Sequence, residues 1–568
     1  MAEAASQGWP ARSWGLTIAG AAIGVAIDRL LPAELWRGPP PPDALAFATF
    51  LAVAGLCIAL LVERTGNRPA VVFALLAAAV VAGVTRTAGI GVPFGPDPWR
   101  LLWAVVAVAV ATPLFQAWRS ARPHGGGLPY AVAHERAWTD LLLLGAGLVF
   151  VGIVWTMALL LAELFNLIGI AALKTLLDKR LFGWALTGAA LGGGIGLLRE
   201  RDAILATLKR VVTTVLAVLA PVLAAGLVVF ILSLPFTGLT PLWQATRSTT
   251  PILLSCVWGA LVLVNTVIGD GRDEEARSRV LRGSAVALSA TLLFLGVIAA
   301  VSVAARIRQH GISPDRLWAV TVCGIACAYG LAYLVALLRG RAEWMAVARQ
   351  SNLNLAIGLG GLALLLASPM IDFGAIATRD QLARLQRGAV TAEKFDLAAL
   401  RFDFGPAGVA ATRALARTGT PAIRAAATAA LVAESKYKMV DVRQRAEQER
   451  RWVFMPAGIA PPQALLDALR SESSCGFGSR TCLIMVDATK GEAIVVPTSD
   501  IVNSANIIRR QANGKWLREG WGVPRQAAKE TVSQAAIERA IKAGRVEVRT
   551  VPQRQVFVDG QPIGEPFP

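Results

Sequence analysis

Long apolar runs recur through the first two thirds of the sequence, and they constrain its fold more than any other feature. A helix that crosses the hydrocarbon core of a bilayer needs about 20 predominantly apolar residues. Runs of about this length, bounded by charges, Pro or Gly, occur at residues 14–33, 44–62, 69–85, 101–118, 139–162, 182–198, 211–234, 251–268, 283–305, 317–338 and 353–369. The sequence therefore predicts an α-helical polytopic membrane protein with about 11 transmembrane helices, followed by a soluble tail.

Composition and charge support this class. Hydrophobic residues make up 55% of the chain and charged residues 17%, which is more apolar than an ordinary soluble protein. The formal net charge of +18 suggests a nucleic-acid partner at first sight. However, the basic residues form short clusters between apolar runs and not one basic face, as expected of membrane topology. We therefore expect membrane lipids around the chain and no nucleic acid.

The distribution of Lys and Arg predicts an orientation, because cytoplasmic loops are enriched in these residues. With the N-terminus inside, the connections at 199–210 and 270–282 are the most clearly basic of the cytoplasmic set. The connection at 235–250 carries a single Arg and belongs to the outer set. An odd number of spans then places the C-terminal tail outside the cytoplasm.

Two segments of the apolar region have a distinctive pattern. The connection Glu163–Leu181 is amphipathic, and it predicts either an interfacial helix or a re-entrant segment. In the next run, Gly188, Gly192 and Gly196 recur at four-residue intervals. This small-residue pattern predicts close packing of two helices, with a lipid or substrate groove along the smooth face as the alternative.

The tail changes from helical to strand patterning. Residues 378–386, 406–417 and 421–434 have helical character, whereas Lys490-Gly491 and Asp559-Gly560 lie between apolar strands as hairpin turns do. A helical period at 531–542 separates the two hairpins. We predict four parts in the chain: spans one to four at 1–137, spans five to eleven at 138–369, a juxtamembrane helical segment at 370–451 and an extracytoplasmic α+β domain at 452–568.

Cys475 and Cys482 are the cysteines of the polar tail, separated by the flexible sequence GFGSRT. In an oxidising compartment such a pair is expected to form a disulfide. The spacing is wider than in typical redox-active or metal-binding pairs, and no His accompanies it. The sequence therefore predicts a structural disulfide outside the cytoplasm.

Motifs for catalysis or metal binding are incomplete. His134 and Glu135 begin the sequence HERAW like a zinc-protease helix, but Trp138 stands where that motif needs its second His. Walker, dinucleotide-binding and nucleophile-elbow patterns do not occur in the sequence. Asn265 is the most deeply placed polar residue of the later spans, with an interhelical hydrogen bond or ligand binding as its roles. We expect no catalytic residue, metal or cofactor.

More specific polar residues gather on the predicted outer side of the membrane. They form a candidate outer-face surface in the connection before the eighth span and just after the last span: Trp243, Arg247, Asp372, Arg379, Gln381 and Arg384. One interpretation is interfacial anchoring and a capped helix after the membrane. The alternative is a docking surface for an anionic lipid-linked intermediate or an envelope protein.

Several segments carry a family resemblance. They are LPFTGLTPLWQATRSTTPILL followed by LVLVNTVIGDG, then ISPDRLWAVTVCGIACAYGLAYLVALL, and SPMIDFGAIATRDQLARLQRGAVTAEKFDLAALRFDFGPAG. Together, over Trp138–Gly408, they resemble a bacterial inner-membrane family known as domain of unknown function 4153 (DUF4153). The first four spans and the tail beyond Arg413 lie outside this resemblance. It implies a polytopic protein of the bacterial inner membrane, with no established activity.

These observations favour a non-enzymatic envelope scaffold, sensor or partner-binding protein that displays a periplasmic domain. The alternative is a transporter or flippase for an anionic or lipid-linked substrate.

Overall fold

The fold is that of a computed structural model, and it comprises two compact units, Met1–Val432 and Ala433–Pro568. The structure describes residues 10–32, 40–64, 66–88, 98–238, 249–433, 435–436, 452–456, 459–471, 481–487, 489–498, 506–511, 514–519, 543, 554–558 and 561–567. The boundary between the units precedes the predicted start of the α+β domain at residue 452. Each unit is described by itself.

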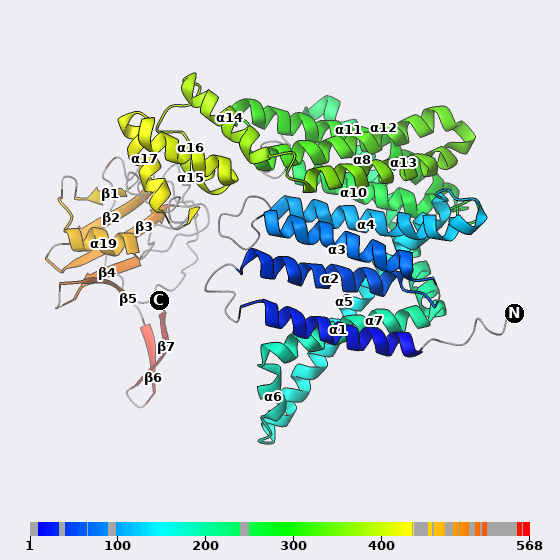
Figure 1. The fold of residues 1–568 in the computed structure, drawn as a ribbon. Helices are drawn as coiled ribbons and strands as arrows, with labels where there is room; N and C mark the ends of the chain where they lie inside the picture. Colours follow the sequence, from blue (N-terminus) through cyan, green and yellow to red (C-terminus); the bar gives the residue numbers. More distant parts are fainter. Residues whose placement is uncertain are drawn as a thin grey trace. The chain divides into compact units, whose positions relative to one another are not determined.

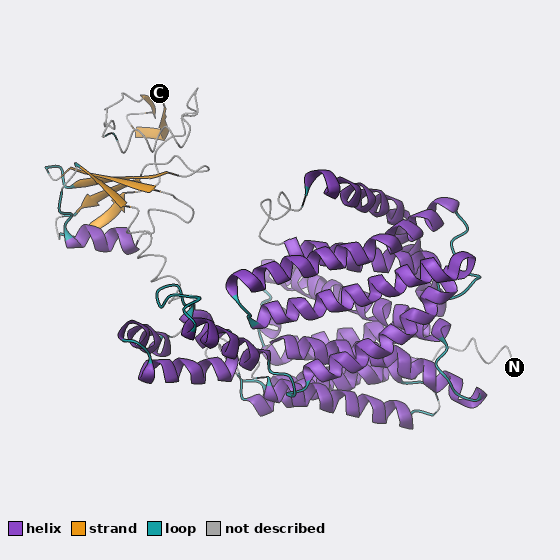
Figure 2. Ribbon diagram, turned by 90° about the horizontal axis from the view of Figure 1, so that it is seen from above, coloured by secondary structure: helices purple, strands orange, loops and turns teal. Residues whose placement is uncertain are grey.

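The first unit is built of long helices (Figures 1 and 2). They are α1 (Pro10–Leu30), α2 (Pro42–Leu61), α3 (Arg68–Thr87), α4 (Pro98–Ala121), α5 (Tyr130–Leu167), α7 (Arg180–Glu200), α8 (Asp202–Thr237), α10 (Thr249–Ile268), α11 (Arg279–His310), α12 (Pro314–Gly340) and α13 (Trp344–Ala367). Each predicted apolar run overlaps one of these helices, but α5, α8 and α13 begin nine residues before the runs predicted for them. Short 3-10 helices, η2 (Arg122–His124) and η3 (Arg341–Glu343), follow α4 and α12.

Among the described residues, 9 helical stretches are long and apolar enough to cross a membrane. One of them, Pro314–Ala367, contains both α12 and α13, and α1 is not among the nine. The chain is therefore a multi-pass helical membrane protein.

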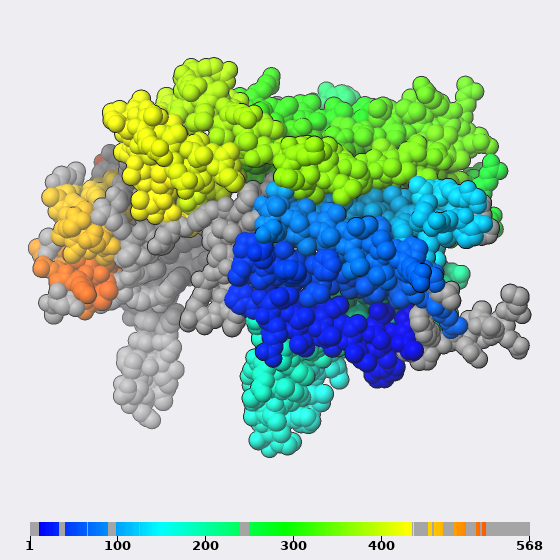
Figure 3. Space-filling model, in the orientation of Figure 1, coloured from blue at the N-terminus to red at the C-terminus, as the bar shows by residue number. Residues whose placement is uncertain are grey.

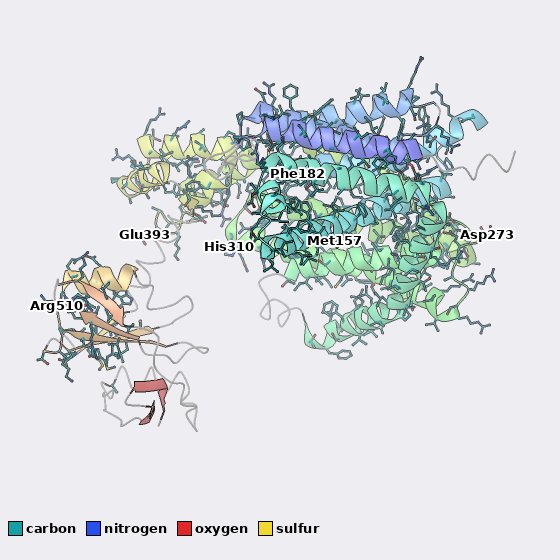
Figure 4. All side chains as sticks on the ribbon, turned by 90° about the horizontal axis from the view of Figure 1, so that it is seen from below. Met157, Phe182, Asp273, His310, Glu393 and Arg510 are labelled. Atoms are coloured by element: carbon teal, nitrogen blue, oxygen red, sulfur yellow. The ribbon has the colours of Figure 1, made fainter. Side chains whose placement is uncertain are left out.

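The long helices of the first unit lie side by side, so that their termini gather at two ends of the unit (Figure 1). Phe182 and His310 lie at one end and Asp273 at the other (Figure 4). We call these the His310 end and the Asp273 end. At the His310 end, Arg180 at the start of α7 forms an ion pair of 2.6 Å with Asp28 near the end of α1. The helices α1 and α7 are therefore antiparallel neighbours.

Glycines bring the backbones of α1 and α7 into direct contact. A Cβ atom at Gly188 would lie 2.1 Å from the carbonyl oxygen of Gly20, and one at Gly192 would lie 2.1 Å from that of Leu16. A side chain larger than hydrogen therefore cannot be accommodated without separating the helices. The predicted close packing at the glycine repeat is confirmed.

The largest core of the first unit combines buried residues of α3, α4, α8, α10, α11, α12 and α13. Leu288, Leu292 and Leu295 of α11 recur on one face of the helix and are fully buried in this core, together with Val264 of α10 and Tyr333 of α12. The 3.6-residue helical period explains why these positions share one face.

The segment Glu163–Leu181 forms the last turn of α5, the short helix α6 (Ala172–Leu177) and the start of α7. α6 projects from the helical unit and has no buried residue (Figures 1 and 3). Leu167 is 82% exposed and Ile168 68% exposed. The segment therefore does not insert between the helices of the unit, and its apolar surface suits contact with lipid.

Four helices complete the first unit: α14 (Phe373–Gln386), α15 (Leu397–Phe402), α16 (Gly405–Thr418) and α17 (Pro421–Val432). The helical character predicted at 378–386 and 406–417 is thus confirmed, and that predicted at 421–434 is confirmed as far as Val432. Phe395, Leu400 and Phe404 are buried among these elements.

The second unit contains a five-stranded sheet in the order β1-β2-β3-β4-β5. Its strands are β1 (Trp452–Met455), β2 (Thr481–Asp487), β3 (Glu492–Thr498), β4 (Asn506–Arg510) and β5 (Trp516–Glu519), with β1 parallel to β2 and the other pairs antiparallel. The amphipathic helix α19 (Gln463–Ser471) buries Leu465 and Leu469 in one core with Ile484, Val495 and Ile508 of the sheet. A separate hairpin joins β6 (Arg554–Val558) and β7 (Gln561–Phe567).

Both predicted hairpins are present. Asp487 pairs with Glu492 across the Lys490-Gly491 turn, where Gly491 adopts a φ of 60°. β6 and β7 flank the second predicted turn. The helix predicted at 531–542 and Cys475 lie outside the described residues. Cys482 is buried in β2, and its disulfide with Cys475 stays a prediction.

Candidate functional site

A polar cavity of about 550 Å³ opens at the Asp273 end of the first unit. The starts of α5 and α8, the end of α10 and the connection at 269–278 form its walls. Its lining consists of His134, Glu135, Trp138, Ala206, Lys209, Arg210, Thr213, Asn265, Thr266, Gly269, Asp270 and Glu274. We call this cavity the polar pocket. Its size is in the range of pockets that bind small molecules.

Lys209 is the charged centre of the polar pocket. Its side chain is 16% exposed, and it forms ion pairs with Glu135 of α5 and, at 3.5 Å, with Glu274 of the connection after α10. Carboxylate oxygens of Glu135, Asp270 and Glu274 lie within 4.8 Å of one another. Such oxygens are the ligands of hard cations, but here the Lys209 ammonium already pairs with two of the three carboxylates. The arrangement therefore describes a charged binding surface and does not by itself define a metal site.

Asp270 follows the end of α10 and faces this cluster. Burial raises the pKa of its carboxyl group above the usual value, and the neighbouring Glu274 carboxylate adds to the rise, whereas Lys209 opposes it. A carboxyl group in this environment holds its proton to higher pH than an exposed Asp. Asp270 is thus the member of the cluster that we expect to respond to pH.

The start of α5 contributes aromatic and imidazole groups. The Tyr130 Oη and His134 Nδ1 atoms lie 3.0 Å apart, and the rings of His134 and Trp138 meet edge to face at 6.5 Å. These residues are four apart, so they share one face of the helix. The sequence HERAW thus forms part of the polar pocket, although its second zinc-binding His is absent.

A hydrogen-bonded chain leads from the polar pocket into the helical core. Asn352 Nδ2 of α13 donates to Asn265 Oδ1 of α10 at 2.6 Å, and Tyr333 Oη of α12 donates to Asn352 Oδ1 at 3.0 Å. The Tyr333 side chain is fully buried. The interhelical hydrogen bond predicted for Asn265 is confirmed, and the same residue also lines the polar pocket. Polar groups within membrane-spanning helices are costly, and they are expected at functional positions in membrane proteins.

A buried guanidinium holds the wall of the polar pocket in place. Arg349 of α13 is 8% exposed; its Nη1 donates to the Ile268 carbonyl at 2.9 Å and its Nη2 lies 2.9 Å from Glu275. The first bond satisfies a carbonyl at the end of α10, where a cation also interacts favourably with the helix dipole. The second fixes the connection that carries Asp270 and Glu274. Arg349 therefore positions this wall without lining the cavity.

The predicted outer-face surface is at the opposite end of the unit where the structure describes it. Gln381 Nε2 donates to the carbonyls of His310 at 3.1 Å and Ile312 at 2.9 Å, and Arg384 Nη2 donates to Gln309 at 3.2 Å. Asp372 Oδ1 accepts from the Ala375 amide at 2.9 Å.

These contacts fit the interpretation of a capped helix after the membrane. Asp372 is the N-cap of α14, and Gln381 and Arg384 satisfy carbonyls at the end of α11. Arg379 is exposed on α14. Trp243 and Arg247 lie outside the described residues. The docking role of this surface stays a prediction.

Comparison with protein families gives one match. A family model described as Domain of unknown function (DUF4153) matches residues 18–415. The match also covers α1 from residue 18 onward and all of α2, α3 and α4, which the resemblance noted from the sequence did not include. No curated protein and no solved structure matches the chain.

Proposed function

This chain belongs to the DUF4153 family, and we propose that it is an inner-membrane protein that binds and moves a small charged solute through the polar pocket. The observation that carries this proposal is the cavity at the Asp273 end, which is continuous with the hydrogen-bonded Asn265–Asn352–Tyr333 chain. Solute pathways are where polar side chains inside a membrane are expected. The proposed role is binding and movement of the solute, not its chemical conversion.

The charges of the polar pocket indicate a class of solute. Three carboxylates and two basic side chains line it, together with the aromatic side chain of Trp138. An excess of negative charge beside an aromatic ring favours an ammonium group. We therefore propose a cationic or zwitterionic solute, in place of the anionic one considered from the sequence.

The proposed topology is eleven crossings in a bacterial inner membrane, with the N-terminus and the polar pocket cytoplasmic and the second unit periplasmic. The basic connections at 199–210 and 270–282 both lie at the Asp273 end, in line with the enrichment of Lys and Arg in cytoplasmic loops. The number eleven is supported by the helices of the described residues: the nine apolar stretches contain ten helices, because Pro314–Ala367 comprises both α12 and α13, and α1 is the eleventh. Alkaline phosphatase fused after Arg451 should be active and fused within 270–282 inactive; the reverse pattern contradicts this topology.

A comparison of metabolites tests the solute-binding role. Cells that lack the protein should change their content of one cationic or zwitterionic solute. Wild type and Asp273→Asn should restore that content and Glu135→Gln should not, because Asp273 belongs to the same connection as Glu274 but does not line the cavity. Accumulation of a lipid-linked compound would favour a flippase, and an unchanged profile of charged solutes would contradict the proposal.

A scaffold or sensor role is the second candidate, and the separate compactness of Ala433–Pro568 favours it. A unit that folds around its own core suits the binding of an envelope partner. Removal of residues 433–568 should then abolish cross-linking to that partner while the solute content stays at its wild-type level. Loss of the solute phenotype on this truncation, at unchanged membrane abundance, would argue against separate roles.

A further inference from the structure

A second cavity, entirely apart from the polar pocket, runs between α1, α2 and α7. Its volume is about 280 Å³, and its lining is formed by apolar side chains and glycines, with Trp184 and Thr187 as the residues that carry polar atoms. The hydroxyl of Thr187 is already engaged, since it accepts from Trp155 Nε1 at 3.0 Å and donates to the Gly183 carbonyl at 2.8 Å. Apolar cavities of this kind do not hold water. We call it the apolar groove.

The Asp273 end of the apolar groove is basic. Arg199 Nη1 of α7 donates to the carbonyl of Ala59, a residue of the groove wall, at 2.6 Å. Arg12 of α1 donates to the carbonyl of Arg199 and lies one helical turn before Leu16, which also lines the groove. Two guanidinium groups from different helices therefore meet at one mouth of the apolar groove.

The surrounding charges leave this mouth positive. Arg199 interacts electrostatically with Arg12, Arg136, Asp140 and Glu63. Glu63 also forms an ion pair with Arg119, and Glu200, next to Arg199, accepts a hydrogen bond from Ser13, next to Arg12. Among the described residues, four guanidinium groups thus stand against three carboxylates. A ligand that combines an anionic group with a hydrocarbon chain would match both the charge of the mouth and the apolar wall behind it.

We propose that the apolar groove binds one anionic phospholipid of the membrane leaflet at the Asp273 end, with an acyl chain along α1, α2 and α7 and its phosphate at Arg12 and Arg199. Guanidinium groups bind phosphate through paired N–H donors, and basic pockets between transmembrane helices on the cytoplasmic side hold anionic headgroups. The proposal does not depend on the solute role of the polar pocket.

Retention of added phospholipid by the purified full-length protein tests this assignment. The protein in detergent is incubated with phosphatidylglycerol or with phosphatidylcholine of the same acyl chains, and the lipid retained after gel filtration is counted by native mass spectrometry. Wild type should retain phosphatidylglycerol preferentially. Arg12→Gln should lower this preference about fivefold, the loss expected for one basic residue near an anionic headgroup, whereas Arg279→Gln, an exposed residue at the start of α11, should not.

Filling the apolar groove tests its other half. Ala52→Trp should reduce the retention of both phospholipids, and Val72→Trp, which adds the same side chain to the exposed face of α3, should not. If Ala52→Trp does not purify as a single folded species, Ala19→Phe places a smaller ring in the same groove. Equal retention of the two phospholipids by wild type, or unchanged retention when the groove is filled, would overturn the assignment.

Discussion

The contact between α1 and α7 gives the sharpest stability prediction, because it joins two backbones. A Cβ at Gly192 would lie 2.1 Å from the Leu16 carbonyl oxygen, and Cβ atoms are essentially never found closer than 3.0 Å to a heavy atom of another part of the chain. Gly192→Ala therefore forces the helices apart by about 1 Å, and neither atom is the end of a flexible side chain. Overpacking of this kind costs about 1–3 kcal/mol. We expect Gly192→Ala to lower the unfolding midpoint of the purified protein by several degrees.

Gly145→Ala is the matched control, since a Cβ at Gly145 on α5 would meet no atom within 4 Å. Alanine is the better helix former, so this change should be neutral or stabilise by up to about 1 kcal/mol. Both variants are scanned at one heating rate, because membrane proteins often unfold irreversibly. If both substitutions shift the midpoint equally, or if Gly192→Ala has no effect, α1 and α7 do not pack through their backbones.

Three further predictions concern the polar pocket and the tail. Arg349→Met removes the partner that lies 2.9 Å from Glu275 and leaves the more distant Arg282, at 3.7 Å; it should lower the free energy of unfolding by about 2–3 kcal/mol and expose residues 269–278 to protease. The control Arg272→Met breaks an exposed ion pair with Glu343 and should lower the free energy of unfolding by under about 0.5 kcal/mol. Equal losses in the two variants would refute the positioning role of Arg349. Because the folded-state pKa of Asp270 is raised, ionisation of its carboxyl group costs stability as pH rises above about 4, so the stability of Asp270→Asn relative to wild type should increase over that rise. A difference that does not change with pH would contradict this sign. Cys475 and Cys482 should resist thiol labelling in the denatured, unreduced protein until reductant is added, and two free thiols would count against the periplasmic location of the tail.

The helices could be predicted from the sequence because each long apolar run carries its own signal. The spacing of Gly188 and Gly192 likewise predicted a close helix contact, although only the structure shows that the partner is α1. In the tail, Lys490-Gly491 predicted a hairpin, because the turn between two adjacent strands depends on residues that are close in sequence. These successes all rest on residues near one another in the chain.

The polar pocket could not be predicted, because its charged residues come from three distant segments. Glu135, Lys209 and Glu274 each lie at the end of a span, where a charge is expected for topology alone and carries no sign of a partner. In the sequence, His134 and Glu135 are recognisable only as part of an incomplete zinc-binding motif. The contacts of Gln381 with His310 and Ile312 could not be predicted either, because these residues are distant in sequence. The N-cap role of Asp372 could be predicted, because this residue directly precedes α14.

Binding of solutes to the purified protein tests the central claim most directly. The unfolding midpoint is measured against a panel of small amines, zwitterionic amino acids and organic anions, for wild type, Glu135→Gln and Asp273→Asn. We expect a cationic or zwitterionic solute to raise the midpoint of wild type and Asp273→Asn but not of Glu135→Gln, since ligands stabilise only the state that binds them. A midpoint that responds to organic anions alone, or a shift that Glu135→Gln retains in full, would contradict a solute site in the polar pocket.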